Sequence, residues 1–245
     1  LKKKGSLEKD VYPQLINRKK IYAKEYSEKF IDMGRTHDLK KMPGFIKKFY
    51  YKPALFLDRD GVINKDVGYA NQIKDFIWRN NIKKFVKNYN DKNFYVIVIT
   101  NQSGISREFF DWNKYEQITD KLIEYLGSKV MITAIYANGY KDQLSSKGWR
   151  KPEPGMLIDA ANQLKIDLTR SILIGDRLSD MKAATRANIK HIFYLPGANQ
   201  CEMRESISER VDSNGYFFDS NLKARLGVLN SLEDIEMDKI IEIIK

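Results

Sequence analysis

The feature that most constrains the fold is an alternation of apolar runs and helix-like segments that begins near residue 52. The apolar runs cover residues 54–57, 94–100, 130–136, 171–175 and 190–194, and the second of them is rich in β-branched residues. The segments typical of helices cover residues 82–89, 111–126, 154–164 and 178–188. This alternation is typical of successive βαβ units. We therefore predict an open, Rossmann-like α/β domain over residues 52–245, with a parallel sheet and helices on both faces. A short strand near residues 216–218 and an amphipathic helix after Ser231 are predicted to follow.

Two carboxylates mark the end of the first predicted strand. Asp58 and Asp60 are separated by one residue and followed by Gly61. In open α/β sheets, ligands bind beyond the carboxyl ends of the strands. Two acids this close repel each other unless a cation or hydrogen-bond donors compensate them, and Mg²⁺ is the cation that best suits such oxygen ligands. An isolated D-x-D-G is more often a polar turn, so the other strand ends decide between the two interpretations.

The other strand ends carry matching chemistry. Thr100 ends the second strand, Lys151 precedes a predicted helix, and Asp176 follows the fourth strand. A carboxylate can attack phosphorus, and a second acid can transfer the proton. A hydroxyl and a lysine can bind phosphate oxygens, while a further acid completes a metal site. Each residue alone is commonplace, and Asp180 suits a helix N-terminus as well as a metal. Together, on successive βα units, they favour a phosphoryl-transfer enzyme.

Composition and charge exclude several other classes. The 245 residues carry a net charge of +11, but residues 1–52 hold 15 Lys and Arg against 6 Asp and Glu, whereas the remainder holds 28 against 26. The basic excess is therefore separate from the carboxylates, and no basic motif of a nucleic-acid-binding module is present. No apolar stretch approaches the length of a membrane span. One cysteine, Cys201, excludes an internal disulfide, so we expect a reducing, cytoplasmic location and neither nucleic-acid nor membrane partners.

The set formed by these strand ends resembles that of the haloacid dehalogenase-like hydrolases over about residues 53–195. The resemblance implies that Asp58 is the nucleophile and Asp60 the general acid and base. It also implies Mg²⁺ bound by Asp58, the backbone carbonyl of Asp60, and Asp176. Thr100 and Lys151 would bind the phosphoryl group. The loops after the first and third strands are too short for a cap domain of this superfamily, so we predict a capless enzyme with an open site.

Four motifs are similar to those of the D-glycero-D-manno-heptose-1,7-bisphosphate 7-phosphatases: FLDRDGVINKDVGY at residues 56–69, TNQSGISR at 100–107, RKPEPGM at 150–156 and GDRLSDM at 175–181. The resemblance implies substrate contacts from the loops after the strands, namely Asp66, Gly68, Tyr69, Asn101, Gln102, Ser103, Arg150 and Arg177. Arginines at positions 150 and 177 also suit a second phosphate, because a guanidinium is permanently charged and can form two parallel hydrogen bonds.

The loop before Arg150 departs from that family. Many members carry a Cys-x-His…Cys-x-Cys zinc loop there, whereas residues 138–149 of this chain contain neither Cys nor His. We therefore expect no structural zinc. Packing of Tyr140 or Trp149 is expected to hold the loop instead. This departure weakens the transfer of substrate specificity more than the transfer of mechanism.

The N-terminal segment, residues 1–51, has a resemblance of its own. The runs SLEKDVYPQL at residues 6–15 and FIDMGRTHD at residues 30–38 are similar to the C-terminal end of sugar-1-phosphate nucleotidyltransferases. The Gly-rich nucleotide loop of that family is absent, so the segment cannot transfer a nucleotide by itself. The resemblance implies the tail of a larger, bifunctional heptose-activating protein with an upstream nucleotidyltransferase domain; a solvated helical extension is the alternative.

These observations give three ordered hypotheses. The first is a Mg²⁺-dependent phosphatase that acts on a sugar bisphosphate through an aspartyl-phosphate intermediate, with the 7-phosphate of the heptose bisphosphate as its target. The second is the related histidinol-phosphate phosphatase, which lacks the Asn-x-Asp-x-Gly-Tyr loop found at residues 64–69. The third is a non-catalytic partner module of a nucleotidyltransferase, which the intact set of catalytic residue types disfavours.

Overall fold

The computed structural model describes residues 5–27, 30–66, 76–196, 216–219, 222, 224–235, 238, 240 and 242. The chain divides into two compact units, Leu1–Phe45 and Ile46–Lys245. The first unit contains the one-turn helix η1 (Leu7–Val11), helix α1 (Tyr12–Asn17) and the beginning of α2 (Thr36–Tyr50). None of the described residues of this unit is buried. Its division from the second unit lies within α2, a few residues before the boundary predicted at residue 51, and its nature as a tail stays a prediction.

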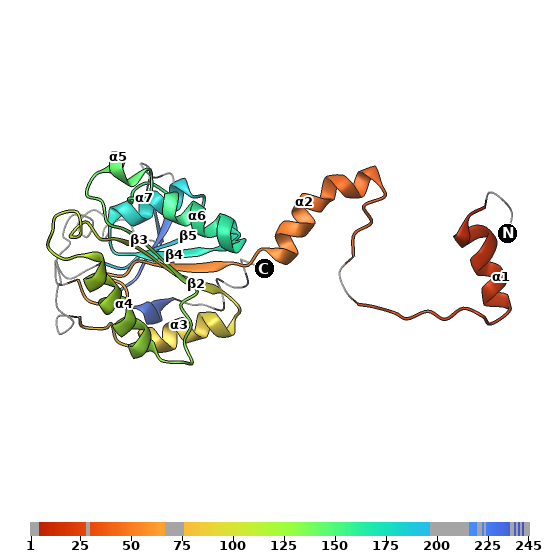
Figure 1. Ribbon diagram of the computed structural model, residues 1–245, viewed down its shortest axis with the longest axis horizontal. Helices are drawn as coiled ribbons and strands as arrows, with labels where there is room; N and C mark the ends of the chain where they lie inside the picture. The colour runs from red at the N-terminus through yellow and green to blue at the C-terminus, as the bar shows by residue number, and fades with distance from the viewer. Residues whose placement is uncertain are drawn as a thin grey trace. The chain divides into compact units, whose positions relative to one another are not determined.

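The second unit is built on a sheet to which seven described strands contribute (Figure 1). The strands are β1 (Ala54–Leu57), β2 (Tyr95–Asn101), β3 (Ala134–Asn138), β4 (Ile172–Gly175), β5 (His191–Tyr194), β6 (Tyr216–Asp219) and β7 (Ala224–Val228). Their order is β3-β2-β1-β4-β5-β7-β6, and neighbouring strands are parallel except for the antiparallel pair β6 and β7. The predicted open α/β fold is confirmed, with β1 in the interior of the sheet between β2 and β4.

Helices cover both faces of this sheet, as Figure 1 shows. Helices α3 (Ile82–Asp91) and α4 (Trp112–Leu126) lie on one face, and α6 (Gly155–Leu164) and α7 (Leu178–Arg186) on the other. The alternation of side chains along β1 explains the two layers: Leu55 and Leu57 join the core beneath α3 and α4, whereas Ala54 and Phe56 join the core beneath α6 and α7. All four β1 residues are completely buried, as expected for a central parallel strand.

Three short helical segments complete the described elements of this unit: α5 (Gln143–Ser146), η3 (Leu168–Arg170) and η4 (Leu232–Asp234). Helix α5 lies in the loop between β3 and α6, and it is only four residues long. Among the described residues, neither the loop after β1 nor the loop after β3 forms a separate folded unit, in agreement with the capless prediction. None of the described helices has the length and apolar composition needed to cross a membrane.

Most predicted elements agree with the structure, and two differ from it. The third strand begins at Ala134 rather than at residue 130, because residues 127–130 form a turn closed by a hydrogen bond from Val130 N to Gly127 O. Strand β7, which pairs in parallel with β5, was not predicted. Of the helix predicted after Ser231, the described residues include η4, whose first turn Ser231 caps, and helical positions at 238, 240 and 242.

Candidate active site

The ends of three neighbouring strands, β2, β1 and β4, meet at one edge of the sheet and form a cleft of about 590 Å³. This volume is in the range typical of small-molecule sites. Ten predicted site residues line the cleft: Asp58, Asp60, Asp66, Thr100, Asn101, Gln102, Ser103, Arg150, Lys151 and Arg177. Asp176 follows β4 directly and is completely buried beside Asp58. Gly68 and Tyr69 lie outside the described residues.

Lys151 is the buried cation of the site. Its side chain is 2% exposed, and its Nζ lies 2.8 Å from Oδ2 of Asp58 and 2.5 Å from Oδ1 of Asp180. It also donates a hydrogen bond to the carbonyl of Ile99 at 3.1 Å. Burial alone lowers the pKa of Lys151, but the facing carboxylates of Asp180 and Asp58 raise it above its ordinary value. The lysine therefore stays charged next to the proposed nucleophile.

Asn101 holds the backbone of Lys151 in place. Its Oδ1 accepts a hydrogen bond from Lys151 N, and its Nδ2 donates one to Lys151 O, each at 3.1 Å. A single side chain at the end of β2 thus fixes both peptide groups of the residue that precedes α6. This contact adds a positioning function to a residue that the sequence associates only with substrate.

Three buried carboxylates, one of them that of Asp58, lie close together. Ligand atoms of Asp58, Asp176 and Asp180 all lie within 4.8 Å of one another. Burial is the main cause that raises the pKa of Asp58 and of Asp176, and the neighbouring carboxylates raise both further. Such a cluster of carboxylate oxygen atoms fits Mg²⁺, because a divalent cation would compensate the repulsion between the negatively charged carboxylates.

Asp180 has a distinct place in this cluster. Its Oδ2 accepts a hydrogen bond from the backbone N–H of Arg177 at 3.0 Å, which caps the N-terminus of α7. Its Oδ1 faces Lys151. Of the two possibilities raised by the sequence, the structure therefore shows the helix-capping one. The carboxylates of Asp58 and Asp176 remain as the side chains best able to hold a metal.

Two glycines allow the cluster to be this compact. Gly61 has φ +90°, and a Cβ atom on it would lie 2.1 Å from Oδ2 of Asp176. A Cβ atom on Gly175 would lie 2.3 Å from the Cβ of Asp180. Neither close approach leaves room for a side chain, so the backbone of one strand end can lie directly against the carboxylates of the next.

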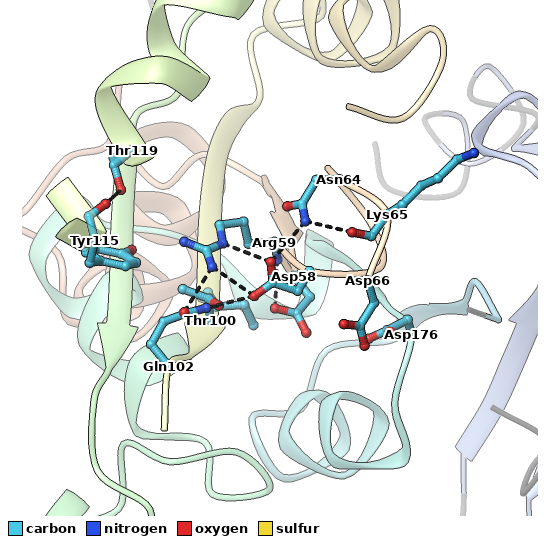
Figure 2. A network of polar contacts seen from close by, with 12 residues as sticks. Asp58, Arg59, Asn64, Lys65, Asp66, Thr100, Gln102, Tyr115, Thr119 and Asp176 are labelled. Atoms are coloured by element: carbon cyan, nitrogen blue, oxygen red, sulfur yellow. Dashed lines mark hydrogen bonds and ion pairs between the residues drawn. The ribbon is translucent and has the colours of Figure 1, made fainter. Parts of the chain in front are cut away.

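The carboxylate of Asp60 is held by several donors, which belong to Arg59, Asn64 and Gln102, labelled in Figure 2. Its carboxylate accepts hydrogen bonds from Arg59 Nε at 3.2 Å and Nη2 at 3.0 Å, from Asn64 Nδ2 at 3.0 Å and from Gln102 Nε2 at 2.8 Å. Burial alone raises the pKa of Asp60, but the charge of Arg59 and these hydrogen bonds hold it below its usual range. Gln102, predicted as a substrate ligand, is itself buried within this network.

The mouth of the cleft carries the two predicted arginines. Arg177 Nη2 lies 2.7 Å from Oδ2 of Asp66, so the loop after β1 and the loop after β4 are joined by an ion pair. Arg150 Nη1 donates to the carbonyl of Tyr140 at 3.0 Å, which joins it to the loop after β3. Both arginines line the cleft together with Lys151.

Trp149 anchors the loop that lacks Cys and His. Its indole Nε1 donates to Oδ2 of Asp159 at 2.6 Å, and its ring lies 5.8 Å from that of Tyr136. Tyr140, the other expected anchor, is 53% exposed and contributes its backbone carbonyl instead. Hydrogen bonding and aromatic packing thus hold this loop against α6 and β3.

Sequence reasoning missed several residues that line the cleft, among them Arg59, Phe110 and Gln143. Arg59 offered a signal, because a cation between two acids in a buried motif has to be paired. Gln143 and Phe110 offered none, since Gln143 begins the four-residue helix α5 and Phe110 lies in a loop, and the local sequence does not determine the path of either segment.

Comparison with known proteins shows which family this chain resembles. A family model described as HAD-hydrolase-like matches residues 148–216. The D-glycero-beta-D-manno-heptose-1,7-bisphosphate 7-phosphatase of Photorhabdus laumondii is 39% identical over 144 residues, covering 56% of this chain and 77% of the relative. The D-glycero-alpha-D-manno-heptose-1,7-bisphosphate 7-phosphatase of the same organism is 37% identical over 174 residues, covering 68% and 94%.

A solved structure shows the same fold. The D,D-heptose 1,7-bisphosphate phosphatase of B. bronchiseptica, complexed with magnesium and phosphate, superposes with a TM-score of 0.63 at 24% identity, covering 78% of this chain and 99% of that one. The sequence matches extend over more than two thirds of both curated relatives at well above 30% identity. The chain therefore belongs to the haloacid dehalogenase-like phosphatase family that contains the D-glycero-D-manno-heptose-1,7-bisphosphate 7-phosphatases.

Proposed function

We propose that this phosphatase hydrolyses the 7-phosphate of D-glycero-D-manno-heptose 1,7-bisphosphate through an aspartyl-phosphate intermediate. The observation that carries the proposal is the position of Asp58 at the base of the cleft. Its carboxylate lies 2.8 Å from the ammonium group of Lys151, with Thr100 and Asp60 on the same cleft wall. A carboxylate beside a fixed cation is suited to receive a phosphoryl group, because the cation attracts the phosphate and stabilises its developing charge.

The first half-reaction forms the intermediate. A carboxylate oxygen of Asp58 attacks phosphorus, and the bond between phosphorus and the sugar oxygen breaks. The negative charge of the bound phosphate favours protonation of Asp60, whose pKa is lowered in the free site, and Asp60 gives this proton to the departing oxygen. Lys151 and the hydroxyl of Thr100 contact the phosphoryl oxygens and keep the phosphorus in line with Asp58.

The second half-reaction releases phosphate. Asp60, now a carboxylate, takes a proton from a water molecule as the water oxygen attacks phosphorus. The bond between phosphorus and Asp58 breaks, which restores the carboxylate and the proton on Asp60.

Asp58, Asp176 and the backbone carbonyl of Asp60 would hold Mg²⁺. Bound there, the ion supplies positive charge that offsets the repulsion between the two carboxylates and the incoming phosphate. The cluster of buried carboxylates described above supports this set. Asp180 would not bind the metal, because its carboxylate contacts Lys151 and caps the N-terminus of α7.

The cleft mouth supplies the proposed substrate selection. Arg150 and Arg177 would bind the second phosphate, and their presence in the same cleft as Lys151 supports this. The sugar hydroxyls would be bound by the surrounding loops, with contacts from Asp66, Gly68, Tyr69, Asn101, Gln102 and Ser103. Engagement of Arg177 by substrate would compete with its ion pair to Asp66.

Phosphate release from the α and β anomers of the heptose bisphosphate, compared with histidinol phosphate, tests this function. We expect kcat/KM to be highest for one heptose anomer, and Asp58→Asn to abolish turnover without changing the fold. Higher kcat/KM for histidinol phosphate would replace the heptose proposal with the second hypothesis. Substantial turnover by the Asp58→Asn variant would contradict the assignment of the nucleophile.

We further infer that residues 1–51 are the tail of a sugar nucleotidyltransferase, so that two consecutive steps are joined in one protein. The motifs at residues 6–15 and 30–38 support this inference, as does the absence of buried residues among the described part of residues 5–45. Transfer of a nucleotidyl group to a sugar 1-phosphate by the full gene product, followed by pyrophosphate release, would test it. No pyrophosphate release above that of the present chain would contradict it.

A further inference from the structure

Arg59, the residue between the two catalytic carboxylates, is turned away from Asp58 and onto Asp60. Its guanidinium makes a forked contact, with Nε 3.2 Å from Oδ1 and Nη2 3.0 Å from Oδ2 of Asp60. Its backbone N–H donates to Oδ1 of Asp58 at 2.7 Å. One residue therefore contacts both acids, but only Asp60 is fixed by its side chain. Such a forked pair defines an orientation as well as a charge.

Two aromatic rings enclose the guanidinium. The guanidinium carbon of Arg59 lies 5.4 Å from the ring centroid of Phe76 and 5.4 Å from that of Tyr115, and the side chain is 5% exposed. Within the described part of the chain, the buried Nη1 has no hydrogen-bond acceptor. Contact with the rings is what remains to stabilise this nitrogen. The guanidinium is consequently held by the two rings as well as by Asp60.

Gln102, the residue directly after β2, completes the arrangement (Figure 2). Its Oε1 accepts from Arg59 Nη2 at 2.9 Å, while its Nε2 lies 2.8 Å from Oδ2 of Asp60 and 2.7 Å from Oγ1 of Thr100. The buried side chains of Arg59 and Gln102 therefore both donate to the carboxylate of Asp60. The Asp60 side chain is itself 26% exposed and lines the cleft. The network leaves Asp60 facing substrate in a single orientation.

We propose that Arg59 is a positioning residue for the phosphatase reaction: held by Phe76 and Tyr115, it orients the carboxylate of Asp60 for proton transfer to the departing sugar oxygen. The inference rests on the proposed function, because it assumes that Asp60 is the general acid. It assigns Arg59 no contact with the substrate. Burying a guanidinium is unfavourable unless it is paired, and an apolar side chain of similar volume would fill the same space without that cost. We therefore infer that Arg59 has a function beyond packing.

Leaving-group chemistry separates positioning from a merely structural contribution. An alkoxide leaving from a sugar phosphate needs a proton in the transition state, whereas p-nitrophenolate leaves readily without one. A variant that misplaces the general acid therefore loses turnover on the sugar phosphate and keeps most of it on p-nitrophenyl phosphate. A variant that only loosens the fold loses turnover on both.

The experiment measures kcat and KM for heptose 1,7-bisphosphate and p-nitrophenyl phosphate in the wild type, Arg59→Met, Arg59→Lys and Asp60→Asn. General acid–base catalysis is typically worth ~10²–10⁴-fold, so Asp60→Asn should lose kcat in that range on the sugar phosphate. Arg59→Met should lose at least about tenfold more kcat on the sugar phosphate than on the aryl ester, with KM little changed. Arg59→Lys should recover only part, because an ammonium cannot form the forked contact.

Tyr115→Leu is the second variant, since it removes one enclosing ring and leaves the cleft residues in place. It should show a smaller loss with the same leaving-group dependence, which keeps the proposal testable if Arg59→Met does not fold. Equal losses on both substrates in the Arg59 and Tyr115 variants, with the selective loss intact in Asp60→Asn, would overturn the positioning inference alone. Absence of the selective loss in Asp60→Asn would overturn the proposed acid, and the inference with it.

Discussion

Gly61 lies so close to Asp176 that a Cβ atom on the glycine would be 2.1 Å from a carboxylate oxygen. We expect Gly61→Ala to lower the free energy of unfolding by about 1–3 kcal/mol from its left-handed φ alone, and to displace Asp176 as well. Gly127→Ala is the matched control, because Gly127 also has a positive φ, +79°, but nothing within 4 Å of its Cβ position. Chemical denaturation should show stability losses in both variants, and phosphate release should fall only in Gly61→Ala. Equal activities would show that the site tolerates the displacement.

Replacement of Lys151 should affect both stability and turnover. In Lys151→Met the buried carboxylates of Asp58 and Asp180 lose their shared cation, and breaking a buried ion pair typically costs about 3–5 kcal/mol. The double variant Lys151→Met/Asp180→Asn should regain part of this stability and none of the activity. Denaturation curves and phosphate release measure the two effects, with the exposed Lys129→Met as control. Activity in the double variant would contradict a direct contact between Lys151 and phosphate.

Divalent metal should stabilise the folded protein even without substrate. Mg²⁺ at about 100 times its dissociation constant would add about 2.7 kcal/mol to the free energy of unfolding, because it binds the carboxylate cluster only in the folded state. Thermal unfolding with Mg²⁺ and with a chelator measures this shift. Asp176→Asn should remove most of it. An undiminished shift in that variant would place the metal elsewhere.

Arg150 should matter more for a bisphosphate than for a monophosphate. We expect Arg150→Ala to reduce kcat/KM for the heptose bisphosphate by at least about tenfold, since a hydrogen bond to a charged group contributes about 1.5–3 kcal/mol. A small monophosphate should lose much less. Arg107→Ala serves as control, because this exposed arginine does not line the cleft. Similar losses on both substrates would argue against recognition of a second phosphate.

His191, at the start of β5, should make stability depend on pH. Burial lowers its pKa from the ordinary 6.5, so the folded state favours the neutral imidazole. The contribution of His191 to the free energy of unfolding is fully present above pH 6.5 and is lost as the pH falls below this value, because the unfolded state then binds more protons than the folded state. Denaturation at pH 7.5 and 5.5 measures the free energy of unfolding at each pH. The difference between the two values should be smaller in His191→Gln than in the wild type. The exposed His37→Gln should not change it.

The parts of this protein that the sequence predicts well are those controlled by local pattern. Strand β1 and the cap of α4 at Asp111 follow from apolar runs and capping residues, and both are observed. Asp58, Lys151 and Asp176 could be grouped because the ends of parallel strands meet at one edge. Periodicity and a single topological rule were sufficient for them.

The parts that could not be predicted depend on contacts between distant residues. The motif associates Gln102 with substrate, and its hydrogen bonds to Arg59, Asp60 and Thr100 could not be foreseen from the local sequence. The partner that Asp180 adopts likewise depends on where Lys151 lies in space. Strand β7 is short and contains a glycine, so its pairing with β5 comes from tertiary structure rather than from local propensity.

The sheet order has a consequence for how the enzyme acquires activity during folding. Asp58 and Asp176 stand on adjacent strands that are far apart in the sequence, and Thr100 comes from the strand on the other side of β1. Contacts of this kind form late and slowly, because a long loop must close before the strands can pair. A chain with only its local helices formed holds none of these groups together. Phosphate release therefore reports completion of the central sheet, and its recovery during refolding should follow the slowest phase of strand pairing.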